Sequence, residues 1–214
     1  MRRHVIKSEA LDALTAKTEH AERTIGRSFI AFVRTPAEKR RKKDPAGFVF
    51  YGTDSFMATY NTPLFNAFVV GSPDEKVKEV RAVIKFFHEQ TAESTSPEDV
   101  HGAVIVEMLK DYNQAIIEDI DEPRANTAEV FIFDARAHLY WISYAGQHGG
   151  QEIRGIGKPV IVRGCYDAET RPRIDETLTR RCRSPRMRKD RLLRVCEDLK
   201  QLTRLKTVSY VPIV

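Results

Sequence analysis

Apolar positions along the chain follow two periods, and the two periods occur in separate blocks. Apolar runs typical of β-strands precede and follow a block in which apolar residues recur every three or four positions, as on one face of a helix. Strands are predicted over residues 28–33, 47–60, 63–72, 128–134, 138–146 and 207–214, and one or two further strands, broken by glycines, over residues 153–164. Helices are predicted over residues 7–22, over residues 74–90, from Ser96 to before Pro123, and onward from Ser184.

The order of these blocks indicates the fold class. Strands and helices that arrive in blocks disfavour a parallel sheet, because each parallel crossover needs its own helix. We therefore predict an α+β fold in which helices cover antiparallel sheets, either as a four-layer sandwich or as an open two-layer form. The predicted organisation is an N-terminal helical arm or propeptide, residues 1–23, followed by a single α+β domain, residues 24–214.

Composition and residue spacing exclude several classes of protein. The 214 residues are 42% hydrophobic and 30% charged, which suffices for a full globular core. No stretch approaches the roughly 18 apolar residues of a membrane span, and no secretory signal pattern is found, so a cytoplasmic location is expected. The three cysteines and six histidines fall in no metal-binding or disulfide spacing, so we predict neither a metal nor a cofactor.

Positive charge is concentrated in two segments. Between Arg171 and Arg194, ten Lys or Arg residues accompany three acidic residues, although the whole chain has a net charge of only +5. A second basic run, EKRRKKD, spans residues 38–44. Such runs bind phosphates or an acidic protein partner, or they form a solvated surface. The predicted binding residues are Arg171, Arg173, Arg180, Arg181, Arg183, Arg186, Arg188 and Lys189.

Several phrases, taken in their order, resemble the proteasome-type subunits, which have the N-terminal-nucleophile hydrolase fold. GFVFYGTDS, with Asp54, is similar to the end of the family's first hairpin, and FVVGSPDEKVKEV to its turn into the first long helix. Leu139, Tyr140 and Gly146 resemble a later hairpin. The resemblance covers residues 24–214. It implies two antiparallel β-sheets sandwiched between helix layers, in a subunit of a homo- or hetero-oligomer.

The resemblance also implies a candidate active site. In the family, an N-terminal threonine attacks the peptide carbonyl and its own α-amino group serves as the base. Thr24 would be that nucleophile in a chain processed after Arg23, with Asp54 beside it. The family's lysine has no counterpart, because no Lys or Arg occurs between Asp54 and Lys76. The implied function is a diverged, non-catalytic subunit of an oligomeric assembly, which hydrolyses peptides only if processing exposes Thr24.

Two other functions fit parts of the sequence. A basic nucleic-acid-binding or scaffold protein would use residues 171–194. EIRGIGK, residues 152–158, is similar to the acetyl-CoA loop of N-acetyltransferases. There Glu152 would repel the pyrophosphate, and the following PVIVRG favours a strand over the helix that such a loop must open.

Overall fold

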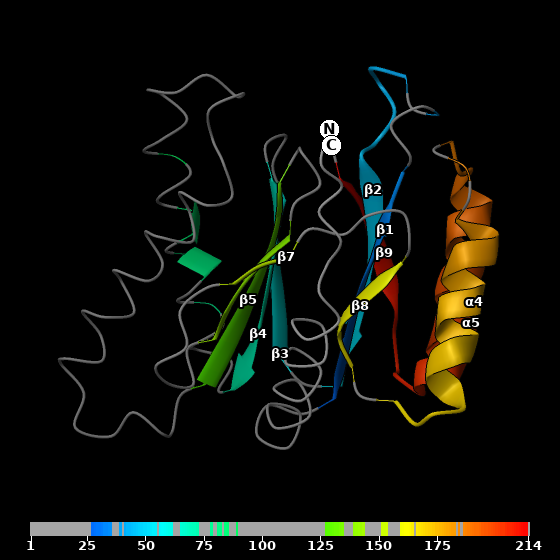
Figure 1. The fold of residues 1–214 in the computed structure, drawn as a ribbon. Coiled ribbons are helices and arrows are strands. Elements are labelled where there is room, and N and C mark those ends of the chain that lie inside the picture. Colours follow the sequence, from blue (N-terminus) through cyan, green and yellow to red (C-terminus); the bar gives the residue numbers. More distant parts are fainter. Residues whose placement is uncertain are drawn as a thin grey trace, which may run out of the picture. The chain divides into compact units, whose positions relative to one another are not determined.

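The structure is a computed structural model in which the chain divides into two compact units, Met1–Asp54 with Arg154–Val214, and Ser55–Ile153. Each unit contains one antiparallel sheet (Figure 1). The predicted α+β class with two antiparallel sheets is therefore confirmed, whereas the stacking of the sheets and the domain boundary at residue 24 stay predictions. The described residues are 27–35, 39, 41–54, 56–61, 65–72, 78, 81–82, 84–85, 89, 127–134, 139–143, 151–153, 159–164, 166–182, 184 and 186–213.

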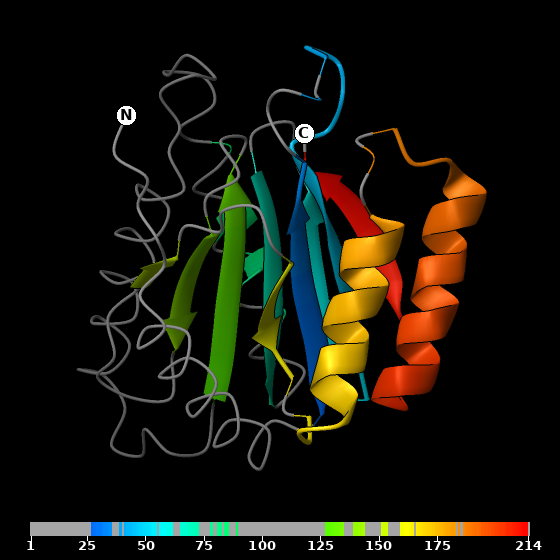
Figure 2. The ribbon, with the colours of Figure 1, turned by 45° about the vertical axis from the view of Figure 1, so that its right-hand side comes forward.

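The first unit is a four-stranded antiparallel sheet with two helices packed on one face (Figures 1 and 2). In spatial order its strands are β8 (Val160–Arg163), β1 (Ser28–Arg34), β2 (Gly47–Thr53) and β9 (Ser209–Ile213). The helices are α4 (Thr170–Arg181) and α5 (Lys189–Thr203). Strand β9 lies at an edge, which suits Pro212 because proline has no backbone N–H to offer a further strand.

Alternate residues of β1 form the core beneath the two helices. Phe29, Ala31 and Val33 belong to one buried cluster, which α4 and α5 complete from above the sheet. Ile30 and Phe32, on the opposite face of the strand, are also buried. The helices contribute Ile174, Leu178, Leu192, Val195, Cys196 and Leu199 to the cluster.

The second unit is a five-stranded antiparallel sheet in which neighbours in space are neighbours in sequence. Its strands are β3 (Phe56–Asn61), β4 (Phe65–Ser72), β5 (Thr127–Asp134), β6 (Leu139–Ser143) and β7 (Gln151–Ile153). The two strands predicted over residues 128–134 and 138–146 correspond to β5 and β6, which pair with each other in antiparallel register. Helical backbone at residues 78, 81–82, 84–85 and 89 agrees with the helix predicted over 74–90. The helices predicted over 7–22 and from Ser96 lie outside the described residues.

Some predictions of helices and strands are wrong. The single strand predicted over residues 47–60 is two strands in two different sheets, because the chain leaves the first sheet at Asp54. Helix α4 is not predicted, since it has only two fully buried apolar residues and carries Pro172 in its first turn. The helix predicted from Ser184 begins at Lys189 instead.

Two leucines of α5 test whether burial under the helices stabilises this unit. Leu199→Ala should lower the free energy of unfolding by about 2–5 kcal/mol, because Leu199 is fully buried in the cluster. Leu193→Ala is the matched control, since Leu193 is 47% exposed and its loss should change stability by about 0.5 kcal/mol or less. Urea denaturation of both variants measures the difference, and equal losses would contradict this account of the core.

Candidate functional site

An ion pair joins the two basic runs of the sequence at one end of the helix pair. Arg186 Nε lies 3.2 Å from Asp44 Oδ2, although 142 residues separate them. The same carboxylate oxygen accepts a 2.8 Å hydrogen bond from the backbone N–H of Arg41, and the Asp44 N–H donates to the Arg41 carbonyl over 2.9 Å. The Arg41 hydrogen bond lowers the pKa of Asp44 most, and Arg186 lowers it further, so Asp44 stays ionised.

Around this ion pair the positive side chains are exposed to solvent. We call the set the basic end surface: Lys39, Arg41, Lys42, Lys43, Arg186, Arg188 and Lys189. The ion pair with Asp44 engages Arg186, and the six other cations are exposed residues of the same two basic runs. A surface of this kind has a positive potential that attracts anions from solution.

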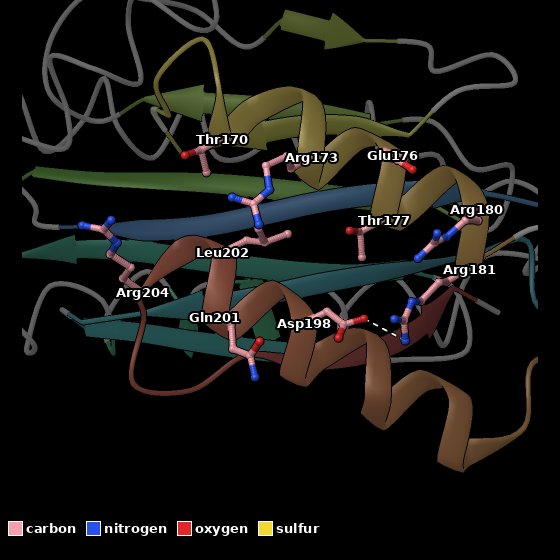
Figure 3. Close-up of a pocket in the computed structure, with 10 residues that line it drawn as sticks. All are labelled: Thr170, Arg173, Glu176, Thr177, Arg180, Arg181, Asp198, Gln201, Leu202 and Arg204. Atoms are coloured by element: carbon pink, nitrogen blue, oxygen red, sulfur yellow. Dashed lines mark ion pairs between the residues drawn. The ribbon is translucent and has the colours of Figure 1, made fainter.

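A groove of about 450 Å³ runs between α4 and α5 (Figure 3). Four arginines line it, Arg173, Arg180, Arg181 and Arg204, together with the acids Glu176 and Asp198. Arg181 Nη1 and Asp198 Oδ2 form an ion pair of 2.8 Å across the groove. Within the described part of the chain, the guanidinium groups of Arg173 and Arg180 have no ion-pair partner. The groove therefore combines one neutralised arginine with cations that remain available to a ligand.

The structure distributes the predicted binding residues over these two surfaces. Arg186, Arg188 and Lys189 belong to the basic end surface, whereas Arg173, Arg180 and Arg181 line the groove. Arg171 is half-buried in the first turn of α4, where its N–H donates to the carbonyl of Asp167. Arg183 lies outside the described residues.

Sequence reasoning did not find the contact that unites the two basic runs. Asp44 and Arg186 are 142 residues apart, so no local pattern relates them. The available signal was Asp44 at the end of the run EKRRKKD, because an acid that follows five cations suggests an internal ion-pair partner.

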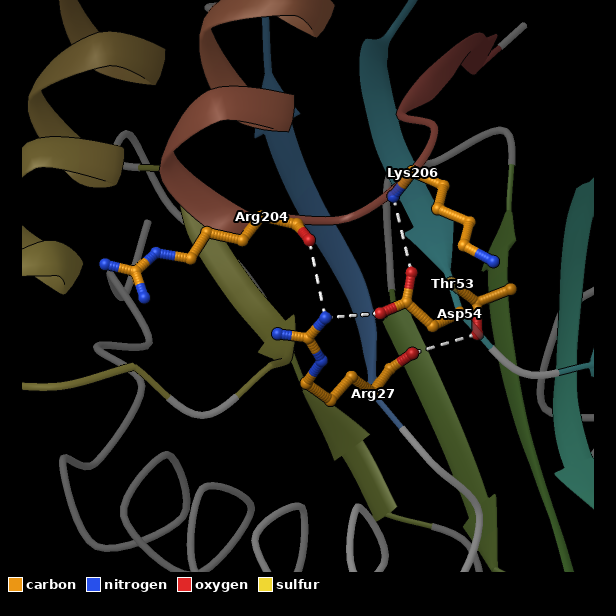
Figure 4. A network of polar contacts seen from close by, with 5 residues as sticks. All are labelled: Arg27, Thr53, Asp54, Arg204 and Lys206. Carbon is orange, nitrogen blue, oxygen red and sulfur yellow. Dashed lines mark hydrogen bonds and ion pairs between the residues drawn. The ribbon is translucent and has the colours of Figure 1, made fainter.

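Asp54, the predicted partner of a nucleophile, holds together three segments of the first unit (Figure 4). Its Oδ2 lies 2.5 Å from Arg27 Nη2, and its Oδ1 accepts a 3.3 Å hydrogen bond from the backbone N–H of Lys206. Arg27 also donates to the carbonyl of Arg204, the residue that follows α5 in a left-handed conformation with φ of 55°. Thr53 Oγ1 donates to the Arg27 carbonyl over 3.0 Å. The network thus ties the start of β1 and the end of β2 to the end of α5.

The environment of Asp54 favours its ionised form. Burial alone would raise the pKa of this carboxyl. The hydrogen bonds from Arg27 and Lys206, and the positive charges of these residues, outweigh burial and hold the pKa below its usual value of 3.8. Thr24, the predicted nucleophile, lies outside the described residues, so the structure does not test the pairing of the two.

The described cysteines are unsuited to nucleophilic chemistry. Burial raises the pKa of the Cys182 thiol to about 12 and that of Cys196 to about 11, so both stay protonated at neutral pH. Both belong to the core cluster under the helices. Within the described ranges, no group of three His, Cys, Asp or Glu residues could hold a metal ion, and no helix is long and apolar enough to cross a membrane.

Comparisons with known proteins include a distant likeness to a solved structure. No protein-family model matches the chain, and no curated protein sequence matches it. Among solved structures, the chain is similar to an Anbu (Gly-1) mutant from Hyphomicrobium sp. strain MC1, at 10% sequence identity and a TM-score of 0.46. The similarity covers 87% of this chain and 82% of that chain. A TM-score below 0.5 at this identity transfers neither activity nor assembly to the chain.

The assignment to the proteasome-type subunits is therefore wrong as a family assignment, because no family model matches. The phrases that suggested it are short strand-and-turn patterns, which unrelated antiparallel sheets share. One of them, GFVFYGTDS, ends where β2 leaves the sheet, and its aspartate is occupied by Arg27 and by the N–H of Lys206. The acetyl-CoA loop is also excluded, since residues 160–163 form β8 where that loop needs a helix.

The Asp54 network predicts a specific dependence of stability on pH. The folded-state pKa of Asp54 is below 3.8, so its ionised form stabilises the folded state at neutral pH, and this contribution is lost as the pH falls through the folded pKa. Asp54→Asn removes it, at a cost under about 1 kcal/mol for a contact near the surface. Urea denaturation should show a difference between wild type and variant that is largest above about pH 5 and shrinks toward about pH 2. A difference that grows as the pH falls would contradict the assignment.

Proposed function

We propose that the chain is a non-catalytic interaction protein that binds an acidic partner protein through the basic end surface and the adjoining groove. One observation carries this proposal. The ion pair between Arg186 and Asp44 brings two basic runs, separate in sequence, onto one end of the first unit. Neither run alone exceeds what ordinary solvated surfaces carry, whereas the ion pair places cations of both runs on the same end of this unit.

The exposed cations suit a reversible interaction. Charges at a solvated rim contribute mostly to the rate and selectivity of association, and salt weakens them within a Debye length of about 8 Å at physiological ionic strength. Lys42 and Lys43 are exposed and adjacent in sequence to Arg41, so three consecutive cations lie in one loop. Association through this surface is therefore steered by charge and falls steeply with salt.

Two features favour an acidic protein over nucleic acid as the partner. The groove contains Glu176 beside its arginines, and an acidic residue repels a continuous polyanion. Neither basic run contains an aromatic residue for stacking on bases. One feature favours the second candidate partner, nucleic acid. The loop with Arg41, Lys42 and Lys43 carries three consecutive cations, and such cations bind the phosphate backbone.

We assign Asp54 a structural role within this function. The hydrogen-bond network around its carboxylate supports that role, since the contacts connect the end of α5 with β1 and β2. Hydrolysis by a chain that begins at Thr24 stays a prediction, as does assembly into an oligomer. N-terminal sequencing with a peptidase assay tests hydrolysis by a chain that begins at Thr24. Mass photometry of the purified chain tests assembly into an oligomer.

Charge reversal in the loop tests the proposed function. Binding of a labelled peptide of mixed acidic and neutral residues, followed by fluorescence anisotropy, should weaken at least about tenfold in Lys42→Glu/Lys43→Glu, because four units of charge change within the basic end surface. The matched control is Lys78→Glu/Lys85→Glu, which changes the net charge equally on exposed residues of the other unit. The wild-type affinity should also fall steeply as salt rises.

The same measurement separates the two candidate partners. A labelled DNA duplex of equal total charge is titrated under the same conditions. Tighter binding of the duplex than of the acidic peptide would support the nucleic-acid function instead. Equal effects of the two double variants, or binding that does not depend on salt, would overturn both.

A further inference from the structure

Two arginines of α4 present their charges to the groove at a fixed spacing. Arg173 and Arg180 are both exposed and line the groove, and neither has an ion-pair partner among the residues that the structure describes (Figure 3). Arg181, next in sequence, differs because Asp198 of α5 neutralises it at 2.8 Å. The groove therefore offers two available cations from one helix, separated by seven residues.

The spacing of these cations matches the repeat of an α-helix. Seven residues of helix correspond to a rise of about 10.5 Å, and two residues one heptad apart lie on nearly the same face. A partner helix placed along the groove would present acidic residues at positions i and i+7 with that same separation. The two helices α4 and α5 lie side by side (Figure 2). A third helix packs in the groove between two such helices.

Glu176 determines what else the ligand must carry. It lies between the two arginines in sequence, three residues after Arg173 and four before Arg180, and it lines the same groove. A continuous polyanion would meet this carboxylate and be repelled, whereas a helix with a cation between its two acids would complement all three side chains. The alternation of positive, negative and positive charge is thus a selectivity element.

We propose that the groove between α4 and α5 binds an amphipathic helix of a partner protein that carries acids at i and i+7 with a lysine or arginine between them. The inference rests on the proposed function, because it names the kind of acidic partner that the surface takes. The half-buried Leu202 provides an apolar contact in the lining, so a small apolar residue on the partner helix completes the fit. The basic end surface, which adjoins the groove beyond Arg181, attracts the partner without selecting its spacing.

Two labelled helical peptides of identical composition test the spacing. The matched peptide has Glu at i and i+7 with Lys at i+3 and i+4, which serves either orientation along the groove. The control peptide moves the second Glu to i+5, on a different face of the helix. In anisotropy titrations with the full chain, the matched peptide should bind about tenfold more tightly than the control. Equal affinities would overturn the inference.

Variants of the chain locate the binding. Arg173→Ala/Arg180→Ala should lower the affinity for the matched peptide about tenfold, since two charge contacts are lost, and alanine preserves the helix. Arg194→Ala/Lys200→Ala removes the same charge from α5 at residues outside the groove lining and should leave the affinity within about twofold. Circular dichroism of each variant verifies that the helices remain folded.

A charge swap at Glu176 provides a readout that partial unfolding cannot imitate. Glu176→Lys should weaken binding of the matched peptide and strengthen binding of a peptide with Glu in place of the two lysines. Loss of both interactions would overturn the inference. If Lys42→Glu/Lys43→Glu weakens binding of acidic peptides while the groove variants and the spacing have no effect, the proposed function holds and the groove inference is wrong.

Discussion

The burial of one face of β1 under α4 and α5 is the interaction on which the rest of the first unit depends. Phe29, Ala31 and Val33 alternate along the strand, and the helices cover them with Ile174, Leu178 and the apolar stripe of α5. Because the apolar face of each helix is directed at the sheet, the polar residues are directed at solvent. The charged groove between the helices is therefore a consequence of core packing.

Ion pairs between distant segments make this concentration of charge compatible with a folded unit. Like charges crowded on one surface repel one another and destabilise the compact state. Asp44 with Arg186, and Asp198 with Arg181, each neutralise one arginine at a point where two segments meet. Each pair contributes little stability by itself at a solvated site. Their position decides which cations are engaged in the fold and which remain available to a ligand.

The sequence predicts the elements well where the signal is local and poorly where it depends on tertiary contacts. The apolar runs of β1, β4, β5 and β6 are continuous or alternating over several residues, so each identifies a strand without its neighbours. Helix α4 escapes because its apolar stripe amounts to two buried residues among many arginines, and only the sheet beneath makes that stripe sufficient. The break between β2 and β3 escapes because aromatic residues continue on both sides of Asp54, and the change of sheet has no local pattern.

The candidate site is likewise predictable from the sequence only where its features are local. The basic residues between Arg171 and Arg194 are evident in the sequence, since charge can be counted without a structure. Their separation into engaged and available cations depends on Asp44 and Asp198, which come from other segments. Helical periodicity then determines which of the arginines act together. Arg173 and Arg180 share a face of α4 with Glu176 in the groove, so positive and negative charges alternate along that face. Selectivity at such a surface comes from the acid between the cations. Removing that acid would raise the positive charge and at the same time erase the distinction between a helix of matched spacing and any other anion.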